Sequence, residues 1–119
     1  MKKRIFVCLL VVAILVCSMV AYAKTTTTPN GYTIDFTYDK HRKSSTSMYN
    51  VRCEAEATLN PGKSDWYVRA YLVGPLGNTI VDSGREYVAK SSTYNYAESP
   101  YSSAHYNDLH ARGNWGGIY

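Results

Sequence analysis

Apolar and polar residues alternate along three stretches of this chain, which is the pattern of strands with one buried face. Residues 32–38 place aromatic and aliphatic side chains at every second position: Tyr32, Ile34, Phe36 and Tyr38. Residues 48–59 do the same with Val51, Cys53, Ala55, Ala57 and Leu59. Residues 65–73 give the strongest strand signal, with Trp66, Val68, Ala70 and Leu72 facing the expected core.

The remaining segments read as shorter strands joined by polar or glycine-containing connections. We predict strands in residues 79–83 and 104–115, and one long strand or two short ones in residues 85–99. The charged, serine-rich residues 39–47 indicate a solvated loop, residues 60–62 a turn, and residues 74–78 a hairpin loop. Apart from the N-terminal apolar segment, no stretch keeps an apolar stripe at helical spacing.

Short strands with turn-rich connections predict an all-β domain, a small antiparallel β-sandwich of immunoglobulin-like architecture, preceded by an N-terminal hydrophobic signal helix. The likeness is one of architecture alone, because the cysteine–tryptophan–cysteine pattern of antibody domains is absent. An open barrel is the alternative arrangement of the same strands.

The N-terminus has the layout of an export signal. Three basic residues precede the apolar run 5–23, whose last positions, Ala21 and Ala23, are the small residues expected at a cleavage site. We therefore predict a signal peptide over residues 1–23, cleavage after Ala23, and a secreted or extracytoplasmic protein. Two alternatives stay open: residues 5–23 are long enough to form an uncleaved membrane anchor, and Cys17 could carry a lipid, although Val16 is not the small residue such a signal requires.

Cleavage changes the composition on which functional inferences depend. Removing 23 of the 119 residues leaves 96, interpreted as an extended leader over 24–30 and the β-domain over 31–119. Three of the 13 basic residues leave with the signal while all nine acidic residues stay, so the net charge falls from +4 to +1. The basic balance therefore gives no support to nucleic-acid binding.

Cleavage also changes the number of cysteines. Two of the three cysteines lie in the signal, so Cys53 alone remains and cannot form an internal disulfide. Its place in the alternating pattern predicts a buried thiol, whereas an exposed Cys53 would indicate pairing between chains.

Metal, cofactor and catalytic motifs are missing from the sequence. His105 and His110 have neither strand nor helix ligand spacing, and His41 lies among cationic residues, so we predict no metal site and no cofactor. Calcium binding is unsupported, because Asp82, Asn107 and Asp108 lie near turns but form no calcium-loop motif.

Enzymatic activity is likewise not predicted, and we assign no catalytic residue. Glu54 and Glu56 would lie about 7 Å apart on one strand face, and with Asp35 they are the candidate carboxylates for glycoside hydrolysis. Alternating charges of this kind usually form a solvated face. A small hydrolase would need a pocket that joins His105 or His110 to Glu54 or Asp35.

Tyrosine is the notable excess, with 12 in the chain, of which Tyr22 alone belongs to the signal. Tyr94, Tyr96, Tyr101 and Tyr106 cluster with serine and asparagine, and rigid amphipathic rings of this kind are common at binding surfaces. The alternative is that these tyrosines only reflect the aromatic preference of strands.

Taken together, these features are typical of small exported bacterial β-proteins and favour a non-enzymatic binding or interaction module at the cell surface or in the medium. Its partner is unknown; a cell-envelope component, a glycan or a protein fits, nucleic acid does not, and membrane contact would come only from an uncleaved signal. The alternatives are a secreted bacteriocin-like or toxin-like effector and, second, the small hydrolase.

Overall fold

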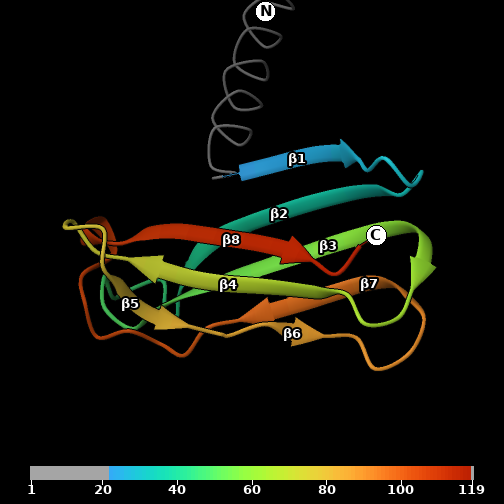
Figure 1. Ribbon diagram of the computed structural model, residues 1–119. Helices are drawn as coiled ribbons and strands as arrows, with labels where there is room; N and C mark the ends of the chain where they lie inside the picture. Colours follow the sequence, from blue (N-terminus) through green and yellow to red (C-terminus); the bar gives the residue numbers. More distant parts are fainter. Residues whose placement is uncertain (1–21, 119) are drawn as a thin grey trace, which may run out of the picture.

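The computed structural model describes residues 22–118 of the chain (Figure 1). Of the predicted signal segment, Tyr22 and Ala23 alone fall inside this range, so the predicted signal helix lies outside the described residues. No helix within residues 22–118 has the length and apolar character needed to cross a membrane.

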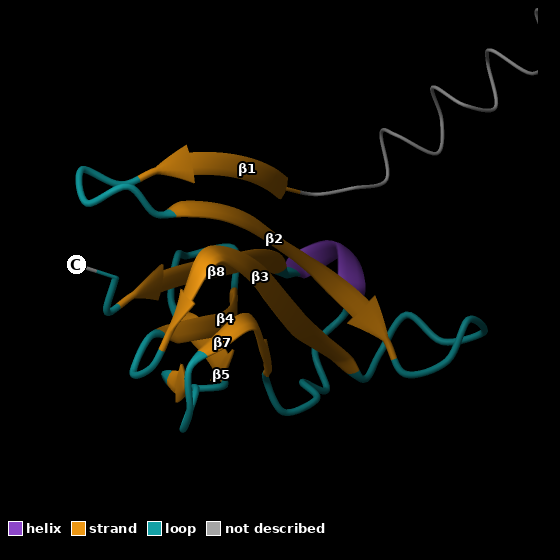
Figure 2. Ribbon diagram, turned by 90° about the vertical axis from the view of Figure 1, so that its right-hand side faces the viewer, coloured by secondary structure: helices purple, strands orange, loops and turns teal. Residues whose placement is uncertain are grey.

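The described chain folds into two antiparallel sheets that pack face to face (Figures 1 and 2). Sheet A has the order β1-β2-β3-β7, formed by Tyr22–Thr27, Thr33–Arg42, Val51–Lys63 and Ser92–Glu98. Sheet B has β4 (Tyr67–Val73) at its centre, with β8 (His110–Gly116) on one side, and β5 (Thr79–Asp82) and β6 (Glu86–Tyr87) on the other. A 3₁₀ helix, η1 (Tyr106–Asp108), precedes β8. The prediction of an all-β domain with antiparallel sheets is confirmed.

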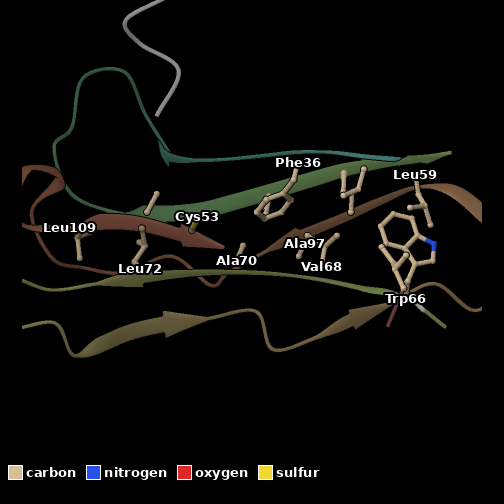
Figure 3. Close-up of a cluster of buried hydrophobic side chains, with 14 of the residues drawn as sticks. Phe36, Cys53, Leu59, Trp66, Val68, Ala70, Leu72, Ala97 and Leu109 are labelled. Atoms are coloured by element: carbon tan, nitrogen blue, oxygen red, sulfur yellow. The ribbon is translucent and has the colours of Figure 1, made fainter. Parts of the chain in front are cut away.

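The core lies between the sheets and consists of the apolar positions that alternation predicts (Figure 3). The inner rows of β2 and β3 contribute Ile34, Phe36, Val51, Cys53, Ala55, Ala57 and Leu59. From the opposite side come Trp66, Val68, Ala70 and Leu72. Because these rows belong to different sheets, the same period-two pattern that forms each strand also supplies the surface that joins the layers.

Strand boundaries differ from the sequence prediction in the first two strands of sheet A. Residues 24–27, interpreted above as part of a leader, form most of the edge strand β1 and pair with β2. Strand β2 continues to Arg42, beyond the predicted loop start, because β3 pairs with it along that whole length.

The predicted turn at residues 60–62 is wrong, since β3 continues through it to Lys63. The pairing of β3 with β7 shifts register between Thr58 and Lys63, which absorbs Pro61 and Gly62 as an irregularity within the strand. Gly62 is required there because a Cβ atom would lie 2.9 Å from the carbonyl oxygen of Ser92.

Candidate binding surface

The outer face of sheet A gathers acidic side chains in neighbouring rows. Thr37, Glu56 and Tyr96 lie opposite one another on β2, β3 and β7, and Asp39, Glu54 and Glu98 form the next row. We call this surface the acidic face; within the described residues it carries five carboxylates and one guanidinium, those of Asp35, Asp39, Glu54, Glu56, Glu98 and Arg52. A cationic ligand would therefore meet a favourable electrostatic potential here.

The Tyr96 hydroxyl connects two of these carboxylates. It lies 2.5 Å from Glu54 Oε1 and 2.9 Å from Glu98 Oε2, and a phenol has one proton, so it donates to one of the two at a time. Arg52 partly neutralises the pair: its Nε donates to Glu54 Oε2 at 3.3 Å and its second guanidinium nitrogen lies 3.2 Å from Glu98 Oε2. The arrangement fixes the Tyr96 ring on the surface and leaves more acceptor than donor capacity.

These contacts shift the titration of both partners. Burial opposes ionisation of Glu54, but the Tyr96 hydrogen bond, His41 and Arg52 outweigh it, so the pKa of Glu54 lies below its usual value. The pKa of Tyr96 is raised by burial and by the adjoining carboxylates, so its hydroxyl remains protonated and able to donate. The face is therefore anionic at neutral pH.

Replacing Tyr96 by phenylalanine is expected to raise the pKa of Glu54, because the carboxylate loses a donor that stabilises its charged form. Stability from the lowered pKa is present above the unfolded-state value and is lost as the pH falls through the folded value. NMR titration of the Glu54 carboxyl carbon measures the change. Tyr94→Phe is the control, since Tyr94 donates to Glu56, and an unchanged Glu54 pKa in Tyr96→Phe would contradict the assignment.

Three of the four predicted tyrosines lie on or beside the acidic face. Tyr94 is 50% exposed and its hydroxyl donates to Glu56 Oε2 at 3.0 Å, beside Tyr96 on β7. Tyr101, which is 38% exposed, has its ring 4.9 Å from the Arg52 guanidinium carbon. The surface therefore combines aromatic rings with carboxylates.

Tyr106 is separated from the other three. It begins η1 and packs against the core, with Lys40 Nζ 3.8 Å from its ring centre. The same ammonium donates to the carbonyl oxygens of Tyr106 and Leu109, at 2.7 and 2.9 Å. Lys40 is on the inner row of β2, so these contacts hold η1 against the end of the sandwich and give Tyr106 a structural role (Figure 2).

A groove of about 400 Å³ lies next to the acidic face, along β2 and beside Tyr22. Its lining comes from β1, β2, β3 and β7 and includes Tyr22, Tyr38, Asp39, His41, Glu54 and Tyr96. The ring of Tyr22 stacks on that of Tyr38, with 4.5 Å between centroids and 13° between planes. Sequence analysis did not find this groove, because it depends on the pairing of β1 with β2, which brings Tyr22 onto Tyr38.

The residues required for a small hydrolase lie on different parts of the molecule. Asp35 and Glu54 are on the outer face of sheet A, whereas His105 caps η1 and His110 begins β8 in sheet B. It is His41 that approaches Glu54, with 3.9 Å between Nε2 and Oε2. Within residues 22–118 no group of three or more potential metal ligands is found.

Sheet B presents a surface of the opposite sign. The outer rows of β4 and β8 carry Arg69 and Arg112, and Arg85 lies with its guanidinium carbon 4.6 Å from the ring centre of Tyr67. Asp82 offsets part of this charge, since Arg69 Nε donates to both of its carboxylate oxygens, at 2.9 and 3.2 Å. Tyr87 is exposed on this side and provides a tyrosine that does not belong to the acidic face.

The buried position predicted for Cys53 is confirmed, and burial raises the pKa of its thiol to about 11. The thiol lies 3.4 Å from the carbonyl oxygen of Arg112, inside the core. It is therefore a packing residue rather than part of the candidate surface.

Neither the protein-family models nor the curated proteins contain a match to the chain.

Proposed function

We propose that this protein is an exported, non-enzymatic binding module and that its contact surface is the acidic face of sheet A with its tyrosines. The observation that carries the proposal is a face that combines five carboxylates with tyrosine rings. The hydroxyls of Tyr94 and Tyr96 contact three of these carboxylates, those of Glu54, Glu56 and Glu98. The ring of Tyr101 lies beside Arg52 at the same face. Export rests on the signal predicted over residues 1–23. We propose the immunoglobulin-like likeness for the two-layer architecture alone. It does not extend to the strand order of sheet A, which is β1-β2-β3-β7.

The chemistry of the face favours a ligand that carries amino groups on a scaffold able to stack against aromatic rings. Carboxylates and a phenol with spare acceptor capacity attract ammonium groups, and tyrosine rings offer flat surfaces at a small entropic cost. An amino sugar of a cell-envelope glycan has both properties. The attraction is between partly exposed charges, so it should weaken as salt rises.

Binding to a tetramer of glucosamine, which is cationic, tests this proposal against a tetramer of N-acetylglucosamine, which is neutral. We expect the cationic tetramer to bind more tightly, and the combined change Tyr94→Ser, Tyr96→Ser and Tyr101→Ser to weaken its binding by about ten-fold or more. Calorimetry at two salt concentrations measures both effects. Tyr87→Ser is the matched control, because it removes an exposed tyrosine from sheet B.

Equal binding of the two tetramers would contradict the electrostatic part of the proposal. Unchanged binding by the triple variant, with its circular dichroism intact, would remove the tyrosine surface from consideration. Because Tyr94 and Tyr101 are exposed, we expect their replacement by serine to leave the domain folded.

A further inference from the structure

The predicted cleavage site falls within a strand of the folded domain. Strand β1 begins at Tyr22, and the bond between Ala23 and Lys24 lies inside its paired region, with Ala23 opposite Thr37 and Lys24 opposite Phe36. Cleavage after Ala23 therefore removes the first two residues of β1 and keeps the rest. All of the buried apolar core lies between Ile34 and Ile118, so it is complete without them.

The residues that cleavage removes cover a specific part of β2. Tyr22 stacks on Tyr38 and meets the ring of Phe36 edge-on, with 6.3 Å between centroids. It also forms one wall of the groove along β2. Its loss exposes one face of the Tyr38 ring and widens this groove.

The backbone of β2 is left open over the same stretch. Strand β3 pairs with β2 as far as Arg42, whereas the described part of β1 pairs with it only as far as Tyr38. After cleavage, the edge of β2 from Thr37 to Arg42 has no partner strand among the residues of sheet A that the structure describes. The N–H of Lys40 on this edge donates to Asp39 Oδ1 at 2.8 Å, a contact that an added strand would replace. An open edge of this kind presents free N–H and C=O groups to any extended peptide.

We propose that this edge is an acceptor site for an extended peptide segment that places an aromatic side chain on Tyr38. Tyr22 and Ala23 show the chemistry that fits, since they occupy the edge as an antiparallel strand with a stacked ring. Main-chain hydrogen bonds to β2 would supply most of the affinity, and the Tyr38 contact would supply the selectivity. The inference rests on the cleavage included in the proposed function, but it concerns a different ligand class, and its contacts are the main-chain edge of β2 and the Tyr38 ring rather than the tyrosines of the acidic face.

A synthetic peptide with the sequence of residues 18–23 provides the probe. Laid in the register of β1, it would run antiparallel from Arg42 to Thr37 and bring its tyrosine onto Tyr38. Its C-terminal carboxylate would lie beside the new ammonium group of Lys24. Two glutamates added before Ser18 improve solubility and would fall opposite Lys43 and Ser44 in the same register.

Fluorescence anisotropy with a labelled peptide compares the protein that begins at Lys24 with a form that retains Tyr22 and Ala23. We expect the first to bind, and the second to bind about ten-fold more weakly because its own strand occupies the edge. Mass spectrometry of protein recovered from the medium first tests whether the chain begins at Lys24; a chain that retains Tyr22 and Ala23 would overturn the inference.

Two changed peptides separate strand addition from nonspecific binding without altering the protein. Serine in place of tyrosine removes the ring that stacks on Tyr38, and proline in place of Val20 removes the backbone N–H that would face Lys40 of β2. Both are expected to bind about ten-fold more weakly. Equal binding by all three peptides, or no binding to the form that begins at Lys24, would overturn the acceptor site. Binding of the glucosamine tetramer would be unaffected by either result, so the two proposals fail separately.

Discussion

Replacing Trp66 by alanine is expected to lower the free energy of unfolding by about 3–5 kcal/mol, the usual range for a fully buried tryptophan. Its side chain is completely buried and fills one end of the core near Leu59 (Figure 3). The indole nitrogen also donates to the carbonyl oxygen of Ser92 at 3.2 Å, at the beginning of β7. The substitution therefore removes packing between the sheets and a polar link to sheet A.

This loss is large compared with the total stability of a domain of this size, about 5–15 kcal/mol. Within residues 22–118 no disulfide offsets it, because Cys53 is the only cysteine there. Urea unfolding followed by far-ultraviolet circular dichroism measures the change. Leu76→Ala is the control, since Leu76 is 93% exposed and its loss should change stability by less than about 0.5 kcal/mol. A loss below about 1 kcal/mol for Trp66→Ala would contradict its assignment as a central packing residue.

Period-two alternation predicted the buried rows of β2, β3 and β4. In a half-buried strand, successive side chains point to opposite faces, so every second residue lies in the core. The same rule placed Glu54 and Glu56 on the outer face and Cys53 in the core. Strand ends were predicted less well. The register between strands decides them, and it allows β2 to include the charged Asp39–Arg42 and β3 to include Pro61.

The candidate surface depends on pairings that no local pattern contains. Tyr96 meets Glu54 because β7 lies beside β3, although 42 residues separate the two in the chain. The tyrosine cluster in the sequence could not show that η1 turns Tyr106 toward Lys40, away from Tyr94 and Tyr96. The groove depends on the pairing of Tyr22 with Tyr38, which alternation within one strand does not predict.

Replacing Asn95 by aspartate is expected to destabilise the domain by about 3–5 kcal/mol at neutral pH, as for other uncompensated buried charges. Asn95 is 7% exposed on the inner row of β7, where its amide nitrogen donates to the carbonyl oxygens of Trp66 and Glu86, at 3.3 and 2.8 Å. Its Oδ1 accepts from the backbone N–H of Tyr96 at 2.8 Å. The side chain thus links both sheets, and a carboxylate there would face two carbonyl oxygens without a proton to donate.

The aspartate variant should also gain a pH dependence that identifies this mechanism. Burial beside carbonyl oxygens raises the pKa of a carboxyl group in the folded state above its unfolded value of about 3.9. Stability is therefore greatest below that value and falls as the pH rises through the folded pKa. Asn95→Ala is the matched variant: it leaves Glu86 without this donor, whereas Trp66 still accepts from the N–H of Val88, so we expect a loss of about 1–3 kcal/mol with no new dependence on pH. Urea unfolding between acidic and neutral pH compares the two, and parallel pH profiles would show that Asn95 does not make the buried contacts assigned to it.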